Sequence, residues 1–592
     1  MKNLSLNEEK MRDLYLRKLA LGEIQGPPTC YESINKSWLK FYSEDQIKAD
    51  LPHMSIYRYM IKNNINHMND NALCYFGKNI SFKKLDNEIN KCVNSFLTYN
   101  IKPGDVVTIC MPNTPEAVIA FYALNKMGAV ANMIHPLSGE KEIKNYLQEV
   151  KSTMVITIDM TCEKILNVKD ETNVKNIICV SPKDSMPFFM KKLYAVSGKN
   201  IKLKNNKNVI TWQKFIKLGK KEAIFEKEYQ SDRTSVIMHT GGTTGVPKGV
   251  ELTDDNFNSM VEQFVLNADN FKRKDKMLTI MPVFHGFGLC SSIHLPLSIG
   301  VTSILLPKLD SKKMDKIFDK YKPNHIIGVP TLFKAMLNNK KLESKDLSYL
   351  KYVVSGGDLI KDSLENDINE FLKKHNSPAK LCKGYGLSEA VAGVTFADKD
   401  YNIPTSIGIP MVKTSIKIVD PETEKEVSNG DIGEICVNGP TTMKQYYNNV
   451  IETENSLHDG WLHTGDLGYC DNGIFYFAQR RGNMIISSGV NVYPSNIEKV
   501  LETHEAVATC AVIGIHHSYK MQVPKAYIIL KEGYEATDEL KEELNELCKK
   551  CLNVYSIPYS YEFREKLPQT LLGKINRKEL SLEEEKVKIY KK

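Results

Sequence analysis

Short apolar runs alternate with amphipathic segments along most of the chain. In the first third, residues 106–110, 154–158 and 176–180 predict buried strands, and Pro115 opens a segment with apolar residues at helical spacing. A second stretch repeats this pattern, with strands predicted at residues 235–238, 277–281, 301–305, 325–329 and 352–354. Continuous apolar strands separated by helices are typical of parallel sheets covered on both faces, so the pattern predicts an α/β fold.

A charge-free stretch, residues 277–307, is long enough to resemble a membrane span. Pro282, Pro296, Gly286 and Gly288 would interrupt a spanning helix several times, and the freed polar groups would need partners in lipid. We expect instead a strand, a turn, a helix and a second strand, all buried in protein.

The pattern changes beyond residue 403. Glycine and proline punctuate short strands there, which indicates a smaller β-rich unit. The last part of the chain is typical of an α+β unit, with helices predicted at residues 494–503 and 537–551 and strands at residues 508–513 and 526–530.

Composition narrows the class of protein. The 592 residues are 42% hydrophobic and 25% charged, which excludes wholesale disorder. The formal charge of +8 is mild, and no lysine or arginine stripe marks a nucleic-acid interface. The thirteen cysteines are scattered and lack ligand spacing, so each is expected to be a thiol in a reducing compartment. Because the first residues are charged and lack an apolar core, we expect no signal peptide and a cytoplasmic protein. No amphipathic basic helix argues for binding at a membrane surface, and the Lys/Asn-rich residues 183–221 are expected to form surface structure.

The most informative run of residues is HTGGTTGVPKG, at 239–249, between a predicted strand and a predicted helix. Its glycines and threonines let backbone amides and hydroxyls approach an anion closely, and Lys248 adds a positive charge. It is not the common P-loop, because Lys248 is followed by glycine and not by serine or threonine. A flexible surface turn is the alternative reading.

Four further runs are each weak alone. Residues 383–389 place a tyrosine between glycines, which suits stacking on a base, and follow it with a serine and a carboxylate that suit phosphate and magnesium. Residues 459–468 place the carboxylate of Asp466 at a glycine turn, which suits a ribose diol. Residues 480–494 and 568–577 add two glycine-containing runs with basic residues.

Together, in this order and spacing, the five runs resemble the core motifs of the adenylate-forming (AMP-binding) superfamily. The run MKQYYN at residues 443–448 looks most like bacterial acyl-CoA synthetases, also named fatty acid–CoA ligases. The resemblance implies a large N-terminal domain, residues 1–480, built from two doubly wound β/α subdomains and a β-rich subdomain. It also implies a small mobile α+β C-terminal domain, residues 481–592, that carries a catalytic lysine.

The resemblance implies a two-step reaction in which a carboxylate attacks the α-phosphate of MgATP, and the thiol of coenzyme A then displaces AMP. The substrates and cofactors implied are a carboxylic acid, ATP, Mg²⁺ and coenzyme A. The residues expected to bind nucleotide are Thr240, Gly241, Gly242, Thr243, Thr244, Gly245, Lys248, Gly356, Gly357, Asp358, Tyr385, Gly386, Ser388, Asp466 and Arg480. Lys574 is expected to bridge carboxylate and α-phosphate, Glu389 to hold Mg²⁺, and Gly489 to serve the thiol step. His285 is either a gate residue of the acyl pocket or a core histidine.

Two positions depart from the family pattern. The pivot of the mobile domain is usually Asp or Lys two residues after the ribose-binding arginine, but here it is Gly482. Glycine would widen the φ/ψ range at the pivot but lose a side-chain anchor, unless Arg481 or Asn483 supplies one. Lys383 replaces the Asn or Glu that relatives often place beside adenine, which puts that contact in doubt.

The candidate acyl pocket is apolar and rich in small residues. Its candidate residues are Phe284, His285, Gly286, Phe287, Gly328, Val329, Pro330, Thr331, Gly356, Val391, Ala392 and Gly393. No Lys, Arg or Asp among them would meet a second charge on the substrate. The set therefore favours an alkyl or aryl monoacid over an amino acid. Since Gly328, Gly356 and Gly393 are expected to leave room for a chain, a medium- or long-chain fatty acid is the expected substrate, with aryl against alkyl left open. Two alternatives are a stand-alone enzyme that loads a carrier protein and a catalytically silent binding homologue.

Overall fold

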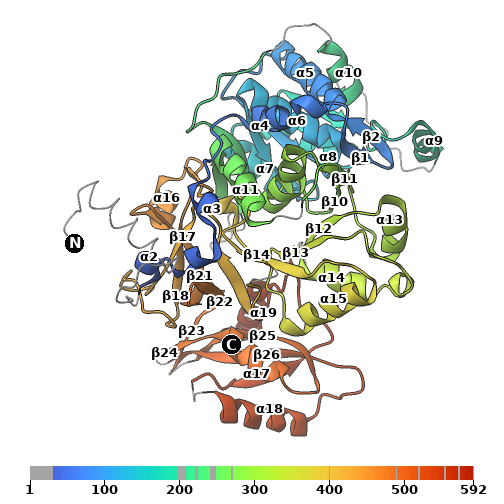
Figure 1. Ribbon diagram of the computed structural model, residues 1–592. Coiled ribbons are helices and arrows are strands. Elements are labelled where there is room, and N and C mark those ends of the chain that lie inside the picture. Colours follow the sequence, from blue (N-terminus) through green and yellow to red (C-terminus); the bar gives the residue numbers. More distant parts are fainter. Residues whose placement is uncertain are drawn as a thin grey trace. The chain divides into compact units, whose positions relative to one another are not determined.

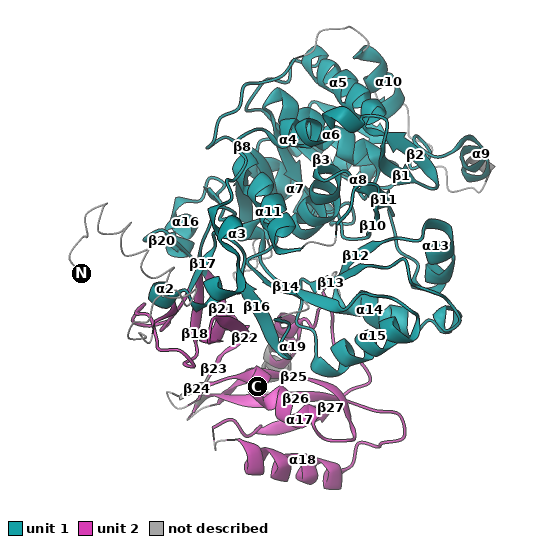
Figure 2. Ribbon diagram, in the orientation of Figure 1, with its two compact units in different colours: residues 1–28, 33–416, 437–463 teal, residues 29–32, 417–436, 464–592 magenta. Residues whose placement is uncertain are grey.

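A computed structural model of the chain describes residues 31–196, 208–219, 225–240, 248–268, 271–398, 401–487, 490–517, 520–552, 555–570 and 574–590. The chain divides into two compact units (Figure 2), each described by itself below. Unit 1 comprises residues 1–28, 33–416 and 437–463, and unit 2 comprises residues 29–32, 417–436 and 464–592. The predicted boundary between residues 480 and 481 falls within unit 2.

Unit 1 contains an eight-stranded sheet. Its strands, in spatial order, are β19 (Gln445–Tyr446), β9 (Lys248–Thr253), β8 (Thr234–Thr240), β4 (Val130–Met133), β3 (Val106–Cys110), β5 (Met154–Ile158), β6 (Asn176–Val180) and β7 (Val209–Thr211). The strands from β8 to β7 are parallel, and β9 and β19 add an antiparallel edge. The strands predicted at residues 106–110, 154–158 and 176–180 are confirmed with the same bounds.

Helices cover this sheet, as Figure 1 shows for the blue and cyan part of the chain. They are α5 (Phe82–Thr98), α6 (Pro115–Met127), α7 (Glu140–Glu149), α8 (Asp159–Val168) and α10 (Trp212–Leu218). The predicted helix at Pro115 is α6, whose N-cap Thr114 accepts a hydrogen bond from the backbone N–H of Ala117 at 3.3 Å. Every residue of α6 is buried, which fits a helix that is apolar on most sides.

A second sheet of unit 1 holds the later predicted strands. Its strands run in the order β2 (Lys78–Ser81), β1 (Asn71–Tyr75), β11 (Thr302–Leu305), β10 (Lys276–Thr279), β12 (His325–Gly328), β13 (Tyr352–Gly356), β14 (Leu381–Tyr385), β15 (Thr395–Ala397) and β16 (Ser406–Pro410). From β1 to β14 the strands are parallel. One face packs on α13 (Met314–Tyr321), α14 (Pro330–Leu337) and α15 (Asp362–Lys374) in a single apolar core.

The charge-free stretch is confirmed as buried protein structure. After β10 the chain forms η4 (Phe287–His294), a π-helix, then α12 (Leu295–Ser298), and returns as β11. Gly288 makes this path possible, because a Cβ there would lie 1.9 Å from the carbonyl oxygen of Pro282. Within the residues that the structure describes, no helix combines the length and apolar character needed to cross a membrane.

Unit 2 contains two groups of strands. The first runs in the order β17 (Ser415–Val419), β18 (Gly433–Asn438), β21 (Trp461–Asp471) and β22 (Ile474–Arg480). The second runs in the order β24 (Val490–Val492), β23 (Ile485–Ser487), β26 (Met521–Leu530) and β25 (Val507–His517), with β27 (Ser560–Phe563) parallel to β26.

Alternation along β25 divides the second group into two faces. Cys510 and Val512 join the core formed with α17 (Pro494–Glu502) and α18 (Asp538–Cys551), whereas Ala511 and Ile513 join the core with α19 (Arg577–Tyr590). The predicted α/β class and the α+β character of the last part are confirmed. The remaining elements are α2 (Glu32–Asn35), η1 (Ser37–Phe41), α3 (Glu44–Lys48), α4 (Ile56–Asn64), η2 (Ile65–His67), η3 (Lys169–Glu171), α9 (Phe188–Val196), α11 (Asp254–Asn267), η5 (Ser311–Lys313), η6 (Lys340–Leu342), η7 (Ser388–Ala390), α16 (Val450–Ser456), β20 (Leu457–His458) and η8 (Arg481–Asn483).

Candidate nucleotide site

The β8–β9 hairpin frames the glycine-rich run. Thr240 at the end of β8 pairs with Lys248 at the start of β9, so the loop between them leaves and re-enters the sheet at one point. Six of the residues expected to bind nucleotide or serve the thiol step lie outside the described residues: Gly241, Gly242, Thr243, Thr244, Gly245 and Gly489. Both ends of the loop lie at the carboxyl end of β8.

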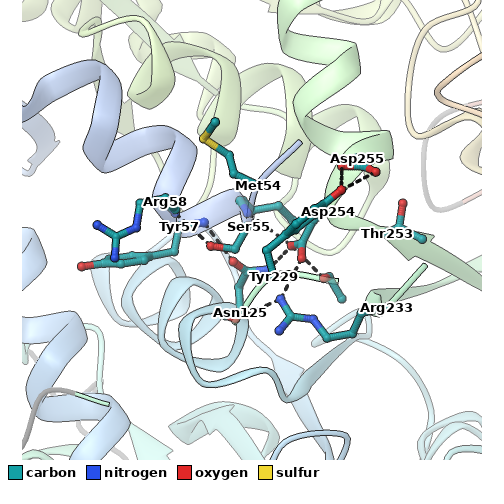
Figure 3. Close-up of polar contacts among 12 residues, drawn as sticks. Met54, Ser55, Tyr57, Arg58, Asn125, Tyr229, Arg233, Thr253, Asp254 and Asp255 are labelled. Atoms are coloured by element: carbon teal, nitrogen blue, oxygen red, sulfur yellow. Dashed lines mark hydrogen bonds and ion pairs between the residues drawn. The ribbon is translucent and has the colours of Figure 1, made fainter. Parts of the chain in front are cut away.

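A buried polar network holds the base of this hairpin (Figure 3). Asp254, the residue after β9, is completely buried. Its Oδ1 accepts hydrogen bonds from Ile56 N at 3.2 Å, Asn125 Nδ2 at 2.5 Å and Ser235 Oγ at 2.8 Å, and its Oδ2 accepts from Arg233 Nη2 at 2.7 Å. Burial raises the pKa of Asp254, although Arg233 and the hydrogen bonds oppose the shift.

The network joins four elements of unit 1. Asn125 of α6 accepts a hydrogen bond from the backbone N–H of Tyr57 in α4 at 2.9 Å, and Asp254 begins α11 beside β8. Asp255 turns the other way and accepts from Tyr229 Oη at 2.6 Å. The hairpin is therefore fixed to α4, α6 and α11 through one carboxylate, which positions the strand that carries Lys248.

Lys248 is held by residues that follow much later in the chain. Its ammonium forms an ion pair with Glu452 of α16 and lies 4.8 Å from the ring centroid of Tyr446, a residue of β19. Tyr446 Oη donates a hydrogen bond to Glu389 Oε1 at 2.8 Å. One tyrosine thus contacts both the predicted phosphate lysine and the predicted magnesium carboxylate, and the structure brings Lys248 and Glu389 together.

Glu389 is the candidate magnesium ligand of this site. It lies in η7 beside Ser388, and its backbone oxygen accepts from Met443 N at 2.7 Å, which fixes the turn. Among the described residues no three His, Cys, Asp or Glu side chains form a cluster that could hold a metal by themselves. Mg²⁺ keeps several waters and is usually bound through one or two carboxylates plus substrate phosphates, so a single carboxylate fits this ion.

Parallel strands bring the other candidates of unit 1 to one edge. Gly328, Gly356 and Tyr385 end β12, β13 and β14, and Gly356 pairs with Gly384. Ligands of parallel sheets bind outside the carboxyl ends of the strands, where these residues lie. Gly357 follows with φ +78°, a left-handed conformation that favours glycine, and leads into Asp358.

Three glycines of the candidate set are required by close backbone or ring contacts. A Cβ at Gly386 would lie 1.7 Å from the carbonyl oxygen of Ala392, and one at Gly286 would lie 2.0 Å from that of Val391. A Cβ at Gly356 would lie 3.0 Å from Phe287 Cζ. The structure thus places Gly356, predicted to border adenine and the acyl pocket, beside Phe287. It also places Gly286, another predicted acyl residue, beside the turn at residues 391–392.

The expectation that glycines leave room for an acyl chain is wrong at two positions. A Cβ at Gly328 would lie 2.3 Å from Leu332 Cδ2, and one at Gly393 would lie 2.7 Å from Met260 Cε. The space beside each glycine is therefore filled by another side chain, which the sequence alone does not reveal. Both atoms are the ends of flexible side chains, so these sites would open only if Leu332 and Met260 changed rotamer.

His285 lies in the turn before η4. Its backbone N–H bonds to Pro282 O at 3.1 Å, and its Nδ1 accepts from the backbone N–H of Phe287 at 3.3 Å. The ring therefore caps a turn that shapes the candidate acyl wall. His239, at the end of β8, is buried, and burial lowers its pKa to about 3, so it is a neutral ring whose Nε2 lies 2.7 Å from Asn132 Oδ1.

Lys383 has a structural partner. Its ammonium lies 2.9 Å from Glu365 Oε2 and donates to the carbonyl oxygen of Ile403 at 2.9 Å. The lysine and glutamate side chains are only 7% and 9% exposed, so the pair is buried. This departure from the family pattern ties β14 to α15.

Unit 2 pairs the two predicted ribose residues. Asp466 and Arg480 lie opposite each other on β21 and β22, and Arg480 Nε lies 2.9 Å from Asp466 Oδ1. Arg481 donates to the carbonyl oxygen of Pro421 at 3.0 Å and lies 3.4 Å from Glu434 Oε2. These contacts fix the Arg481 side chain beside Gly482, which lies in η8. Lys574 is fixed by its backbone, which exchanges hydrogen bonds with Thr570.

Two family descriptions match the chain. Residues 62–447 match the AMP-binding enzyme family, and residues 496–574 match the AMP-binding enzyme C-terminal domain. The chain belongs to the AMP-binding enzyme family. The resemblance predicted from the five runs is confirmed, and the protein is an enzyme of the AMP-forming acid–CoA ligase type.

Relatives of this AMP-binding enzyme span nearly its whole length. A long-chain-fatty-acid–CoA ligase of Bacillus subtilis (strain 168) is 34% identical over 559 residues, covering 93% of this chain and 98% of the relative. A 4-coumarate–CoA ligase 1 of Petroselinum crispum is 28% identical, covering 89% and 94%. The crystal structure of the anthranilate CoA ligase AuaEII with anthranoyl-AMP has a TM-score of 0.77 at 23% identity, covering 90% of this chain and 97% of that one, which shows the fold.

Sequence reasoning about this AMP-binding enzyme missed the side chains that hold Lys248. Tyr446 lies in the run MKQYYN, which was read only as a family signature, and Glu452 belongs to no recognised pattern. They are 198 and 204 positions away from Lys248 in the sequence and reach it because β19 pairs with β9. The one signal for Tyr446 was its place in that run.

Proposed function

We propose that this enzyme activates a medium- or long-chain fatty acid to acyl-AMP and transfers the acyl group to coenzyme A. The observation that carries the proposal is the contact of Tyr446 with both Lys248 and Glu389, because it combines a cation and a carboxylate at the mouth of the glycine-rich hairpin. A polyphosphate with its Mg²⁺ is the ligand that such a pair suits. The apolar Phe287 and Val329 near Gly357 support an alkyl substrate, as does the 34% identity to the Bacillus subtilis ligase.

In the first step a carboxylate oxygen of the acid attacks the α-phosphorus of ATP, and the bond to the pyrophosphate oxygen breaks. Lys248 and the amides of the glycine-rich run would stabilise the departing pyrophosphate. Glu389 would hold Mg²⁺, which neutralises charge on the phosphate oxygens when it is bound. Lys574 would bridge the attacking carboxylate and the α-phosphate, while Tyr385 would stack on adenine.

In the second step the thiolate of coenzyme A attacks the acyl carbon, and the bond to the AMP oxygen breaks. We propose that residues 481–592 form the mobile domain of the family and that Gly489 then faces the thiol. Asp466 and Arg480 would bind the ribose. Asp466 would then accept hydrogen bonds from both Arg480 and the ribose diol. Arg481, held by Glu434 and Pro421, would anchor the pivot beside Gly482.

The test is pyrophosphate release with a panel of alkyl and aryl acids, with and without coenzyme A. Fatty acids of medium or long chain should give the largest kcat/KM, and a thioester should form with free coenzyme A. A thioester formed only on a carrier protein would favour the carrier-loading alternative. No turnover with any acid would favour a silent homologue.

Lys574→Ala separates the two steps. It should lower acyl-AMP formation by at least about a hundredfold, since the charge that meets the developing phosphate charge is lost. The same variant should still convert supplied acyl-AMP and coenzyme A to thioester. Equal loss in both steps would contradict the role proposed for Lys574.

A further inference from the structure

Helix α9 turns its largest apolar side chains outward. The side chains of Phe188, Phe189 and Leu193 are 75%, 72% and 60% exposed. They lie on one face with Lys192, because residues four positions apart are neighbours on the surface of a helix. Figure 1 shows α9 at the margin of unit 1. The helix is therefore a short apolar ridge on the surface of its own unit.

The inner side of the segment anchors this ridge. Met186, just before the helix, is only 5% exposed, and Met190 and Tyr194 on the opposite face are partly buried. Ser185 donates a hydrogen bond to the buried carboxylate of Glu116 at 2.5 Å, which ties the segment to α6. A surface helix normally buries its apolar face. Because α9 is held by its other face and exposes its apolar one, the exposed apolar face indicates a binding partner.

Two lysines lie beside the ridge. Lys192 Nζ lies 4.7 Å from the ring centroid of Phe188, and Lys191 directly precedes Lys192 in the helix. Burial lowers the pKa of Lys78 in β2, and the charges of Lys84 and Lys191 lower it further. The described residues 183–196 contain three lysines and one acidic residue.

The acidic groups near the ridge are directed inward. Asp184 accepts a hydrogen bond from the backbone N–H of Ser181 at 2.9 Å, and burial raises its pKa although Lys183 and Lys191 oppose the shift. Glu116 is buried beneath Ser185. The outward face of α9 therefore combines bare aromatic and aliphatic side chains with lysines, without an exposed carboxylate of its own.

We propose that the face of α9 formed by Phe188, Phe189, Lys192 and Leu193 docks on an anionic phospholipid bilayer. Aromatic and leucine side chains enter the boundary between headgroups and acyl chains, while neighbouring lysines meet anionic headgroups. Charge complementarity selects this occupant over a neutral apolar protein surface. This proposal departs from the sequence-based expectation that no basic amphipathic helix argues for a membrane surface. Docking would give the enzyme access to acids dissolved in the bilayer, and this benefit rests on the proposed function. The docking itself does not depend on the proposed function.

The test is flotation of the full chain, without substrates, on two kinds of vesicle. One contains phosphatidylcholine alone, and the other contains phosphatidylcholine and phosphatidylglycerol in equal proportion. We expect binding to the anionic vesicles, with a partition coefficient at least about tenfold lower on neutral ones and falling as salt is added. Phe188→Ser/Phe189→Ser should lower anionic binding by at least about tenfold, and Leu193→Ser should lower it by a smaller factor.

The matched control is Ile65→Ser/Leu137→Ser, which removes two apolar side chains that are 60% and 56% exposed elsewhere in unit 1. This variant should bind vesicles like the native chain. Native binding that is absent, equal on both vesicles, or equally reduced in the control would overturn the proposal. A second outcome would also overturn the proposal: the native chain does not bind vesicles, and sedimentation velocity shows that it is a dimer which Phe188→Ser/Phe189→Ser converts to a monomer. In that case α9 would face a second copy of the chain.

Activity toward the shortest soluble acid that the native chain turns over distinguishes a failure of this proposal from a failure of the proposed function. Phe188→Ser/Phe189→Ser should leave kcat/KM for that acid unchanged, because none of these side chains belongs to the candidate site. Loss of vesicle binding with normal turnover supports the docking role. A variant inactive toward the soluble acid is misfolded, and Leu193→Ser and Lys192→Glu then decide the question by their own loss or retention of anionic binding.

Discussion

Arg233→Met is the most direct test of how the glycine-rich hairpin is held. Arg233 is the cation that contacts Asp254, and its side chain is 11% exposed while that of Asp254 is fully buried. Methionine keeps the length of the side chain but removes the charge, so the ionised Asp254 would be left unpaired. Removal of one partner from a buried pair costs about 3 to 5 kcal/mol. Because Ile56, Asn125 and Ser235 still donate to Asp254, we expect the lower end, about 3 kcal/mol.

The loss should depend on pH in a defined direction. Burial already raises the pKa of Asp254, and Arg233 opposes that shift, so the substitution raises the pKa further. A raised carboxyl pKa means that stability is present below the ordinary pKa and is lost as the pH rises through the folded-state pKa. The variant should therefore be most destabilised at neutral pH and should recover toward the native value in acid.

Hydrogen–deuterium exchange of peptides from β8 and α11 measures the opening free energy of this part of the fold without assuming two-state unfolding of the whole chain. The matched control is Arg58→Met, also shown in Figure 3, whose guanidinium pairs with Glu226 at 2.5 Å and is 53% exposed. We expect the control to lose less than about 1 kcal/mol. Equal losses in the two variants, or an Arg233→Met loss that does not shrink in acid, would refute the reasoning. Arg233→Met/Asp254→Asn should restore most of the stability.

Three further predictions concern single side chains. Burial raises the pKa of Glu116 to about 7, so the opening free energy of α6 should fall by about 3 kcal/mol as the pH rises from about 4.5 to about 7. Glu116→Gln should flatten this slope in hydrogen–deuterium exchange of α6 peptides, and an unchanged slope would contradict the assignment. Glu452→Gln frees Lys248 and should lower KM for ATP by about three- to tenfold with little change in kcat, whereas a raised KM would show that Glu452 orients the lysine for phosphate. Lys383→Met leaves buried Glu365 without its cation and with only the Asn402 amide as donor, which should cost about 3 kcal/mol of stability. The preference for ATP over GTP should persist, and a lost preference would mean that Lys383 reads the base.

Much of the fold could be predicted because its strands are continuous apolar runs. Residues 106–110, 154–158 and 176–180 are buried on both faces of a parallel sheet, so the sequence signal and the structural element have the same bounds. The strand at residues 526–530 was predicted too short, since β26 begins at Met521. Pro524 lies within that strand, and a proline is normally evidence against a strand interior.

The candidate site could be predicted only where a local run carries it. Asp466 and Arg480 were identified from separate runs, and the structure pairs them across β21 and β22. The Lys248–Glu452 and Lys383–Glu365 pairs were not predicted, because each joins side chains from different runs through sheet pairing or helix packing. The filled spaces beside Gly328 and Gly393 were missed for the same reason, since a glycine shows that a side chain is absent but not what occupies the space.

These pairs suggest how the site handles charge before a nucleotide arrives. Within unit 1 Lys248 is matched by Glu452, and within unit 2 Arg480 is matched by Asp466, so two of the cations expected to contact the nucleotide already have a carboxylate partner. A phosphate or ribose that binds must compete with that partner, which lowers the net gain from each contact. Affinity for any single phosphate should then be modest, and a ligand that satisfies several cations together should be favoured over a fragment such as free pyrophosphate or AMP.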